Sequence, residues 1–352
     1  MIHVADEATA RTTGAPASTA TSASQVQVAG RAYARPAARP AGGRRGKGST
    51  RKALEILFFV APALLLFGMF VVWPVIKAIQ FSVYKWKGYG PLVDFVGLEN
   101  YTRVLQNDVF TDAITHNLIV VVMSIVIQLP LGLAVALLLN RKMKGQGILR
   151  TIIFVPYVLA EVIAGVVWSR MLLAKDSIVT EAFGLIGLSA PAEGFLGTPD
   201  LALGTVIVVL TWKYLGLAII LFLAGLQGVP DELYEAAQID GATWWQVQRK
   251  ITIPLLGPTM RMWGFLSMVG SLQLFDMVWI LTRGGPANST TTMATFLINE
   301  GTKRQNFGIA SAASVILFII ALILALTYQK FIMGRDTNPD SGQTKKRRRT
   351  AA

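Results

Sequence analysis

Residues 230–258 read PDELYEAAQIDGATWWQVQRKITIPLLGP, a polar segment between two apolar stretches that are each long enough to cross a bilayer. Gly228 suits the left-handed position just past a helix end, and Pro230 suits the first position of the next helix. Asp231 and Glu232 then fall in the first turn, where carboxylates complement the helix dipole. The segment therefore predicts a helix that begins outside the apolar stretch.

A turn and a second helix are predicted in the same segment. Asp240 and Gly241 supply the turn, because glycine adopts a positive φ at little steric cost. Thr243 is a suitable N-cap for a short helix that runs through Lys250. Pro254 is expected to stop that helix, since proline lacks the backbone N–H and clashes with the preceding turn.

The spacing of small and acidic residues in this segment resembles a known motif. Its members are Glu235, Ala236, Ala237, Asp240, Gly241, Ala242 and Pro254. They resemble the cytoplasmic EAA loop of binding-protein-dependent ABC importer permeases, and the resemblance implies that they dock on a separate ATPase. The side chains of Ala236 and Ala237 leave a face without bulk, which another protein can approach closely. An ordinary surface hairpin is the alternative, and Gln248 stands where the family often has an aromatic residue.

The composition is that of a polytopic membrane protein. Hydrophobic residues make up 53% of the chain and charged residues 15%, whereas soluble domains have about a quarter charged residues. The apolar residues gather in blocks of about twenty, the length at which an α-helix spans a bilayer. The blocks do not alternate, which argues against a β-barrel. We predict an all-α fold, for which the resemblance implies the type I ABC importer permease architecture, with six transmembrane helices at 54–76, 117–139, 150–171, 203–224, 260–281 and 308–330.

The distribution of basic residues predicts the orientation of these spans. Lys and Arg are dense before the first span, in the short loop 141–144 and after the last span, whereas the loops at 77–116, 172–202 and 282–307 carry nearly balanced charge. The positive-inside rule therefore places both termini and the 229–259 loop in the cytoplasm. We predict a multi-pass protein of the bacterial plasma membrane.

Three regions are predicted along the chain. Residues 1–53 are rich in Ala, Thr, Ser, Pro, Gly and Arg, which indicates a disordered basic cytoplasmic tail, although an organellar transit peptide has a similar composition. Residues 54–333 form the permease domain with its coupling loop at 229–259. Residues 334–352 form a second basic cytoplasmic tail, whose KKRRR run suits contact with anionic lipid. The net charge of +13 is concentrated in these tails, so we predict no nucleic-acid partner.

Catalytic chemistry has no support in the sequence. The chain has no cysteine and two histidines, His3 and His116, so neither a metal site nor a histidine-based triad is expected. The run GGRRGK at 42–47 lacks the spacing of a phosphate-binding loop and follows no strand. We therefore predict a transporter subunit that is not an enzyme and binds no cofactor. The partner subunits are expected to hydrolyse ATP with Mg²⁺.

Several short motifs resemble the carbohydrate, or maltose-type, branch of these permeases. They are Phe154-Val155-Pro156-Tyr157, Trp212-Lys213-Tyr214, Phe275-Asp276-Met277-Val278-Trp279, Leu281-Thr282-Arg283-Gly284-Gly285-Pro286 and the threonines at 290–292. The resemblance extends over about residues 54 to 333. It implies import of a di- or oligosaccharide by an assembly with a second homologous permease, two cytoplasmic ATPases and an extracytoplasmic sugar-binding protein.

Three ionisable residues within the predicted spans are candidates for the substrate path. Glu161, Lys213 and Asp276 must face a cavity or a partner, because a charge that faces lipid is costly. A sugar offers hydroxyl groups to carboxylates and amides, and its rings stack on aromatic side chains. Gln128 and Trp279 are therefore added, and Trp279 shares a helix face with Asp276. In the structural alternative, Lys213 neutralises Glu161 or Asp276 and holds helices together.

Other function classes remain open at this point. ABC permeases for glycerol phosphate or another small polar solute belong to the same branch, so the resemblance does not select the solute. A secondary transporter driven by an ion gradient also has many spans and buried charges, but it is expected to show internal repeats and discontinuous midplane helices, which the sequence does not indicate. A membrane-anchored enzyme would need a catalytic cluster, and the sequence has none.

Overall fold

The computed structural model describes residues 48–141 and 144–334, and the chain divides into two compact units, residues 1–60 and 61–352. In the first unit, the described residues 48–60 belong to one helix. In the second unit, the described residues are mainly helical, and their strand pairing is limited to an isolated bridge between Tyr84 and Phe95. The predicted all-α fold is confirmed. Most of the tails predicted at 1–53 and 334–352, namely residues 1–47 and 335–352, lies outside the described residues.

The helices are short where polar loops and prolines interrupt them and long where the sequence is continuously apolar. In chain order they are α1 (Gly48–Phe67), η1 (Gly68–Val72), α2 (Trp73–Ser82), α3 (Glu99–Leu105), α4 (Asp108–Met123), η2 (Ser124–Gln128), α5 (Leu129–Leu139), α6 (Gln146–Val158), α7 (Glu161–Met171), α8 (Ile178–Leu185), α9 (Pro199–Gln227), α10 (Asp231–Ile239), α11 (Trp244–Val247), η3 (Gln248–Thr252), α12 (Ile253–Leu255), α13 (Gly257–Leu272), α14 (Asp276–Leu281), α15 (Met293–Ile298), η4 (Asn299–Lys303), α16 (Phe307–Tyr328) and η5 (Gln329–Met333). The segments labelled η are π-helical. Because α1 begins at Gly48, the boundary predicted at residues 53 and 54 falls inside a helix.

Four continuous helical stretches in the described residues are long and apolar enough to cross a membrane. They are Glu55–Ser82, Asp108–Leu139, Pro199–Gln227 and Phe307–Met333, and each overlaps a predicted span. The stretch predicted at 150–171 is a pair of helices, α6 and α7, bent by 96°. The stretch predicted at 260–281 is divided between α13 and α14. The predicted count of six transmembrane helices is consistent with this structure but is not confirmed by it, because two of the predicted spans are broken helices.

Three of the π-helical segments stand just before a proline. Pro74, Pro130 and Pro254 each follow the last residue of a π-helical segment by two positions. Proline lacks a backbone N–H, and its ring clashes with the carbonyl four residues earlier. A π turn takes up this distortion without ending the helix. The prediction that Pro254 stops its helix is therefore wrong: the helix continues through Leu255, and α13 begins at Gly257.

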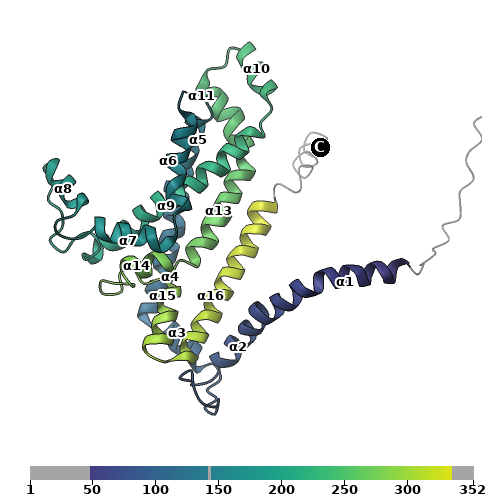
Figure 1. Ribbon diagram of the computed structural model, residues 1–352, viewed down its shortest axis with the longest axis vertical. Helices are drawn as coiled ribbons and strands as arrows, with labels where there is room; N and C mark the ends of the chain where they lie inside the picture. The colour runs from purple at the N-terminus through teal and green to yellow at the C-terminus, as the bar shows by residue number, and fades with distance from the viewer. Residues whose placement is uncertain (1–47, 142–143, 335–352) are drawn as a thin grey trace, which may run out of the picture. The chain divides into compact units, whose positions relative to one another are not determined.

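Helix α9 forms the centre of the second unit and packs against α5, α6, α13 and α14 (Figure 1). One end of α9 contributes Val206 and Leu210 to a core cluster with Val278 of α14. The other end contributes Phe222 to a cluster with Trp263 of α13. Helix α16 packs against α2, α3 and α15 around a third cluster. The buried apolar residues of α9 thus explain its central place.

The break between α13 and α14 is closed by side chains from other parts of the chain. Asn117 of α4 donates a hydrogen bond of 2.6 Å from Nδ2 to the Ser271 carbonyl. Thr292 donates one of 2.8 Å from Oγ1 to the Leu274 carbonyl. A broken helix in a membrane persists when such partners satisfy the freed backbone groups. The break positions Asp276 as the first residue of a new helix.

Candidate coupling loop and translocation cavity

The coupling loop has the predicted helix–turn–helix form. α10 ends before Asp240, and Gly241 has φ +70°, in the left-handed region that favours glycine. A Cβ at Gly241 would meet open space, so a substitution there brings backbone strain without a steric clash. Thr243 caps α11 through a reciprocal pair of hydrogen bonds with Gln246. Gly228 differs from the prediction, because its φ of −85° lies outside the left-handed region.

The small residues of the motif point in different directions. Glu235 and Ala236 are exposed on α10, whereas Ala237 is buried within the chain. The hydroxyl groups of Tyr234 and Thr252 lie 3.3 Å apart and link α10 to η3. The sequence predicted that Ala236 and Ala237 together form a face that another protein can approach. Only Ala236 is exposed in this way, because Ala237 packs inside the chain.

Large apolar side chains beside the motif form an exposed surface that the sequence reasoning missed. Ile239 is 87% exposed and Trp245 is 69% exposed. Trp244 is partly exposed, and the Arg141 guanidinium lies 4.9 Å from the centre of its ring. The sequence indicates this surface by placing large apolar residues, Ile239, Trp244 and Trp245, inside a polar loop. Together with Glu235 and Ala236, these side chains give the loop an apolar and acidic outer surface.

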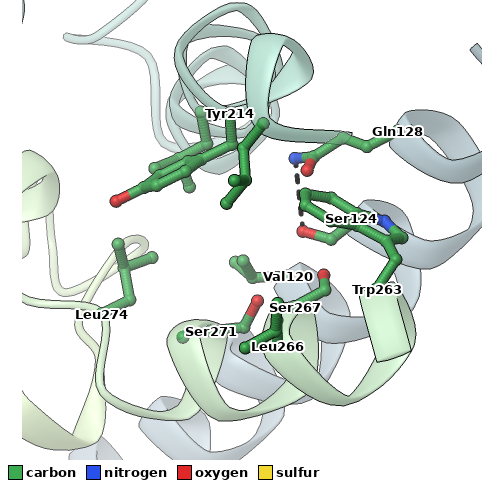
Figure 2. A pocket seen from close by; sticks show the side chains of 12 residues that line it. Val120, Ser124, Gln128, Tyr214, Trp263, Leu266, Ser267, Ser271 and Leu274 are labelled. Atoms are coloured by element: carbon green, nitrogen blue, oxygen red, sulfur yellow. Dashed lines mark hydrogen bonds between the residues drawn. The ribbon is translucent and has the colours of Figure 1, made fainter. Parts of the chain in front are cut away.

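A cavity of about 120 Å³ lies between α4, η2, α9 and α13, and we call it the central cavity (Figure 2). Its polar and aromatic lining residues are Ser124, Gln128, Tyr214, Trp263, Ser267 and Ser271. The remaining lining residues are apolar or glycine, and none of the lining residues is charged. Gln128 and Ser124 lie in the π-helical segment η2, and π segments occur frequently at functional sites.

The central cavity has hydrogen-bonding groups that are not fully used within the chain. Gln128 donates from Nε2 to the Ser124 hydroxyl at 3.4 Å. The indole Nε1 of Trp263 is buried and finds no acceptor among the described residues, although the side chain is only 2% exposed. Because that nitrogen is itself buried, the ring of Trp263 faces the central cavity and its N–H does not. The cavity is thus suited to a hydroxyl-bearing molecule between aromatic walls.

Lys213 holds the bend between α6 and α7. Its ammonium donates to the carbonyls of Pro156 and Tyr157, each at 3.0 Å, and to the carbonyl of Leu159. The side chain is only 3% exposed. Pro156 and Tyr157 belong to the last turn of α6 and Leu159 is its C-cap, where the helix leaves acceptors without an intrahelical donor. The predicted ion pair of Lys213 with Glu161 or Asp276 is not found among the described residues, because the ammonium is bound by backbone instead.

The two carboxylate candidates lie near Tyr214 instead of lining the cavity. The Tyr214 hydroxyl donates to Glu161, the first residue of α7. Asp276 is exposed at the first position of α14, and its charge acts electrostatically on the Tyr214 phenol. Tyr214 itself lines the central cavity. The phenol therefore connects the cavity with the carboxylate groups.

Trp279 makes two contacts away from the central cavity. Its ring stacks on Phe275 with centres 5.3 Å apart, and the Lys303 ammonium lies 5.1 Å from the ring centre. Of the predicted path residues, only Gln128 lines the cavity. Glu161 is connected to the cavity through Tyr214. Lys213 and Trp279 have other partners. Tyr214 and Trp263 are the site residues that the sequence reasoning missed as cavity lining, because nothing in the local pattern places them around one space.

A family of known proteins matches the part of the chain that contains most of these features. The family described as "Binding-protein-dependent transport system inner membrane component" matches residues 128–334. The chain belongs to this family. The matched residues include the whole coupling loop, the bend at Lys213 and most of the lining of the central cavity.

Two relatives are similar to this chain over most of its length and most of their own. The trehalose/maltose transport system permease protein MalF of Thermococcus litoralis is 32% identical over 280 residues, which cover 80% of this chain and 94% of that protein. The diacetylchitobiose uptake system permease protein NgcF of Streptomyces coelicolor is 32% identical over 323 residues, 89% of this chain and 91% of that protein. A solved bacterial alginate ABC transporter, in complex with an alginate pentasaccharide-bound periplasmic protein, has a chain with 24% identity and a TM-score of 0.72. That match covers 83% of this chain and 98% of the other, and it shows the permease fold.

Proposed function

We propose that this permease is a membrane-spanning subunit of an ATP-driven importer of di- or oligosaccharides. The central cavity is the observation that carries the proposal, because it combines the aromatic rings of Tyr214 and Trp263 with the amide of Gln128. Aromatic faces with a few directed polar groups are the usual means of holding a ligand in a defined orientation. Relatives that import trehalose, maltose and diacetylchitobiose support the choice of solute class.

The partners of the permease follow from its family and from its lack of a recognisable nucleotide site. We infer a second homologous permease, two cytoplasmic ATPases that hydrolyse ATP with Mg²⁺, and an extracytoplasmic sugar-binding protein. The solved relative in complex with a periplasmic protein supports the last of these. The exposed surface of α10 and α11, with Glu235, Ala236 and Ile239, is the surface we assign to the ATPase. The permease itself is not an enzyme in this proposal.

The dependence on ATP is tested with the assembled importer. The permease is purified with its neighbouring gene products and reconstituted in vesicles with ATP inside. We expect an ATPase to co-purify and sugar uptake to require ATP. Uptake by the isolated permease in response to a proton or sodium gradient would contradict the proposal, because an importer of this kind has no gradient-coupled step of its own.

The orientation of the permease is part of the proposal, with both termini and the coupling loop in the cytoplasm of a bacterium. Single cysteines at Ser189 and Gln238 test it, because both side chains are exposed and the chain has no other cysteine. In intact cells, an impermeant thiol reagent is expected to label Ser189→Cys and to leave Gln238→Cys unlabelled. Ala313→Cys, which is buried, serves as the unreactive control. Labelling at Gln238 from outside would overturn the orientation.

Trp263→Phe tests the central cavity. The change replaces the indole by a smaller aromatic ring and so removes part of the aromatic wall of the cavity. A sugar that stacks on this wall is expected to lose about 1–1.5 kcal/mol of binding. We therefore expect the half-saturating sugar concentration to rise about tenfold in vesicle uptake.

Trp73→Phe is the matched control, because Trp73 is exposed on α2. It is expected to leave sugar uptake at the level of the unmodified importer. Equal sugar dependence in Trp263→Phe and Trp73→Phe, with normal assembly, would remove the cavity from the path.

A further inference from the structure

Glu161 and Asp276 occupy matching positions on two helices that pack against each other. Glu161 begins α7, Asp276 begins α14, and the two helices are in contact. At that contact a Cβ on Gly165 would stand 2.8 Å from Cγ2 of Ile280. Each carboxylate lies four residues before its contact residue and so on the same helix face. Both carboxylates therefore lie on the facing sides of α7 and α14.

Tyr214 shows that the two carboxylates lie at the same end of this contact and beside the central cavity. Its hydroxyl donates to Glu161, and Asp276 lies within electrostatic range of its phenol. Its ring lines the central cavity, as does Leu274, two residues before Asp276. In Figure 2 the phenol oxygen extends to the side of Leu274, away from Gln128. The cavity is thus bordered on this side by two negative groups.

Lys213 offsets part of the charge of Glu161, with which it interacts electrostatically. Lys213 is the nearby cation, but its ammonium is buried and bound to three backbone carbonyls. The residues that line the cavity are uncharged. A ligand in the cavity therefore does not contact the Lys213 ammonium, and Glu161 and Asp276 together with Lys213 keep a net negative charge.

We propose that Glu161 and Asp276 set the charge preference of the path, so that neutral and amino sugars pass and phosphorylated or uronic sugars are disfavoured. The inference rests on the proposed function, because it concerns the solute that crosses at the central cavity. Like charges within a partly buried site repel measurably, and such repulsion is a common source of specificity. Glu161 also positions Tyr214 through its hydrogen bond, whereas Asp276 acts through its charge.

The test compares pairs of probes that differ in one charge. The assembled importer with its binding protein is reconstituted in vesicles, and uptake is measured for maltose, lactose and diacetylchitobiose and for the aldonic acid of each. Capture of every probe by the binding protein is measured separately, and each uptake rate is divided by it. For the unmodified importer we expect the neutral sugar to be preferred on the order of tenfold over its aldonic acid.

The double variant Glu161→Gln and Asp276→Asn is expected to reduce that preference about tenfold, because both charges are removed while hydrogen-bonding groups remain. Glu193→Gln, which changes an exposed glutamate on a connecting loop, is the charge-matched control and is expected to keep the preference. Two results would overturn the inference and leave the proposed sugar importer intact. One is an unchanged preference in the double variant. The other is uptake of an aldonic acid by the unmodified importer at the same rate as its neutral sugar. Failure to transport any of the neutral disaccharides would instead overturn the proposed function.

Discussion

Replacing Lys213 by methionine is expected to destabilise the permease strongly. The change leaves the carbonyls of Pro156, Tyr157 and Leu159 without the donor that now binds all three. Each buried backbone group without a partner costs about 1–3 kcal/mol, so the total loss is at least about 3 kcal/mol. We expect the bend between α6 and α7 to loosen, with less assembled complex in the membrane and a lower thermal unfolding temperature in detergent.

Two further variants separate this effect from other roles of Lys213. Lys77→Met removes a lysine whose ammonium donates to Gln80 in an exposed setting, so it is expected to change stability little. Glu161→Gln removes the nearest carboxylate and keeps a partner for the Tyr214 hydroxyl. If Lys213 served mainly as a counter-ion, then Glu161→Gln would be as damaging as Lys213→Met. A Lys213→Met permease with unchanged stability would contradict the proposed role of the lysine.

Reversing the charge of Glu235 is expected to abolish most transport while the permease still assembles. Glu235 is exposed on α10, so Glu235→Lys is expected to fold. On the surface assigned to the ATPase, a reversed charge costs several kcal/mol through like-charge contacts or lost pairing. We expect sugar uptake to fall at least about tenfold, with the permease at normal abundance and basal ATP hydrolysis retained. Uptake at the unmodified rate would count against the docking role.

Gly241→Asp addresses the same coupling step through the backbone. The positive φ of Gly241 strains any residue with a Cβ by about 1–2 kcal/mol, although the space around it is open. The turn between α10 and α11 is therefore expected to shift without loss of the membrane helices. Gly228→Ala is the matched control, because Gly228 ends α9 at a φ of −85°, which alanine adopts readily. Reduced uptake in Gly241→Asp and normal uptake in Gly228→Ala is the expected pair of results.

The sequence alone determined the features that depend on neighbouring residues. Continuous apolar blocks indicated the long helices, and the turn at Gly241 and the cap at Thr243 were read from residues next to one another. Local steric and hydrogen-bonding preferences suffice for such features, since each involves a few adjacent dihedral angles. The same local rules were wrong at Pro254, where a π-helical turn accommodates the proline and the helix continues.

Only the tertiary structure decided the features that depend on partners distant in the sequence. Two predicted spans are broken, and both breaks persist because side chains from other helices supply the missing donors: Lys213 at the end of α6, and Asn117 and Thr292 at the end of α13. The central cavity likewise brings together Gln128, Tyr214 and Trp263 from three separate segments. A sequence pattern gives the preference of each segment for helix. It does not give the distant donors that bind the free carbonyl groups where a helix is interrupted inside a membrane. These donors place Glu161 and Asp276 beside the cavity.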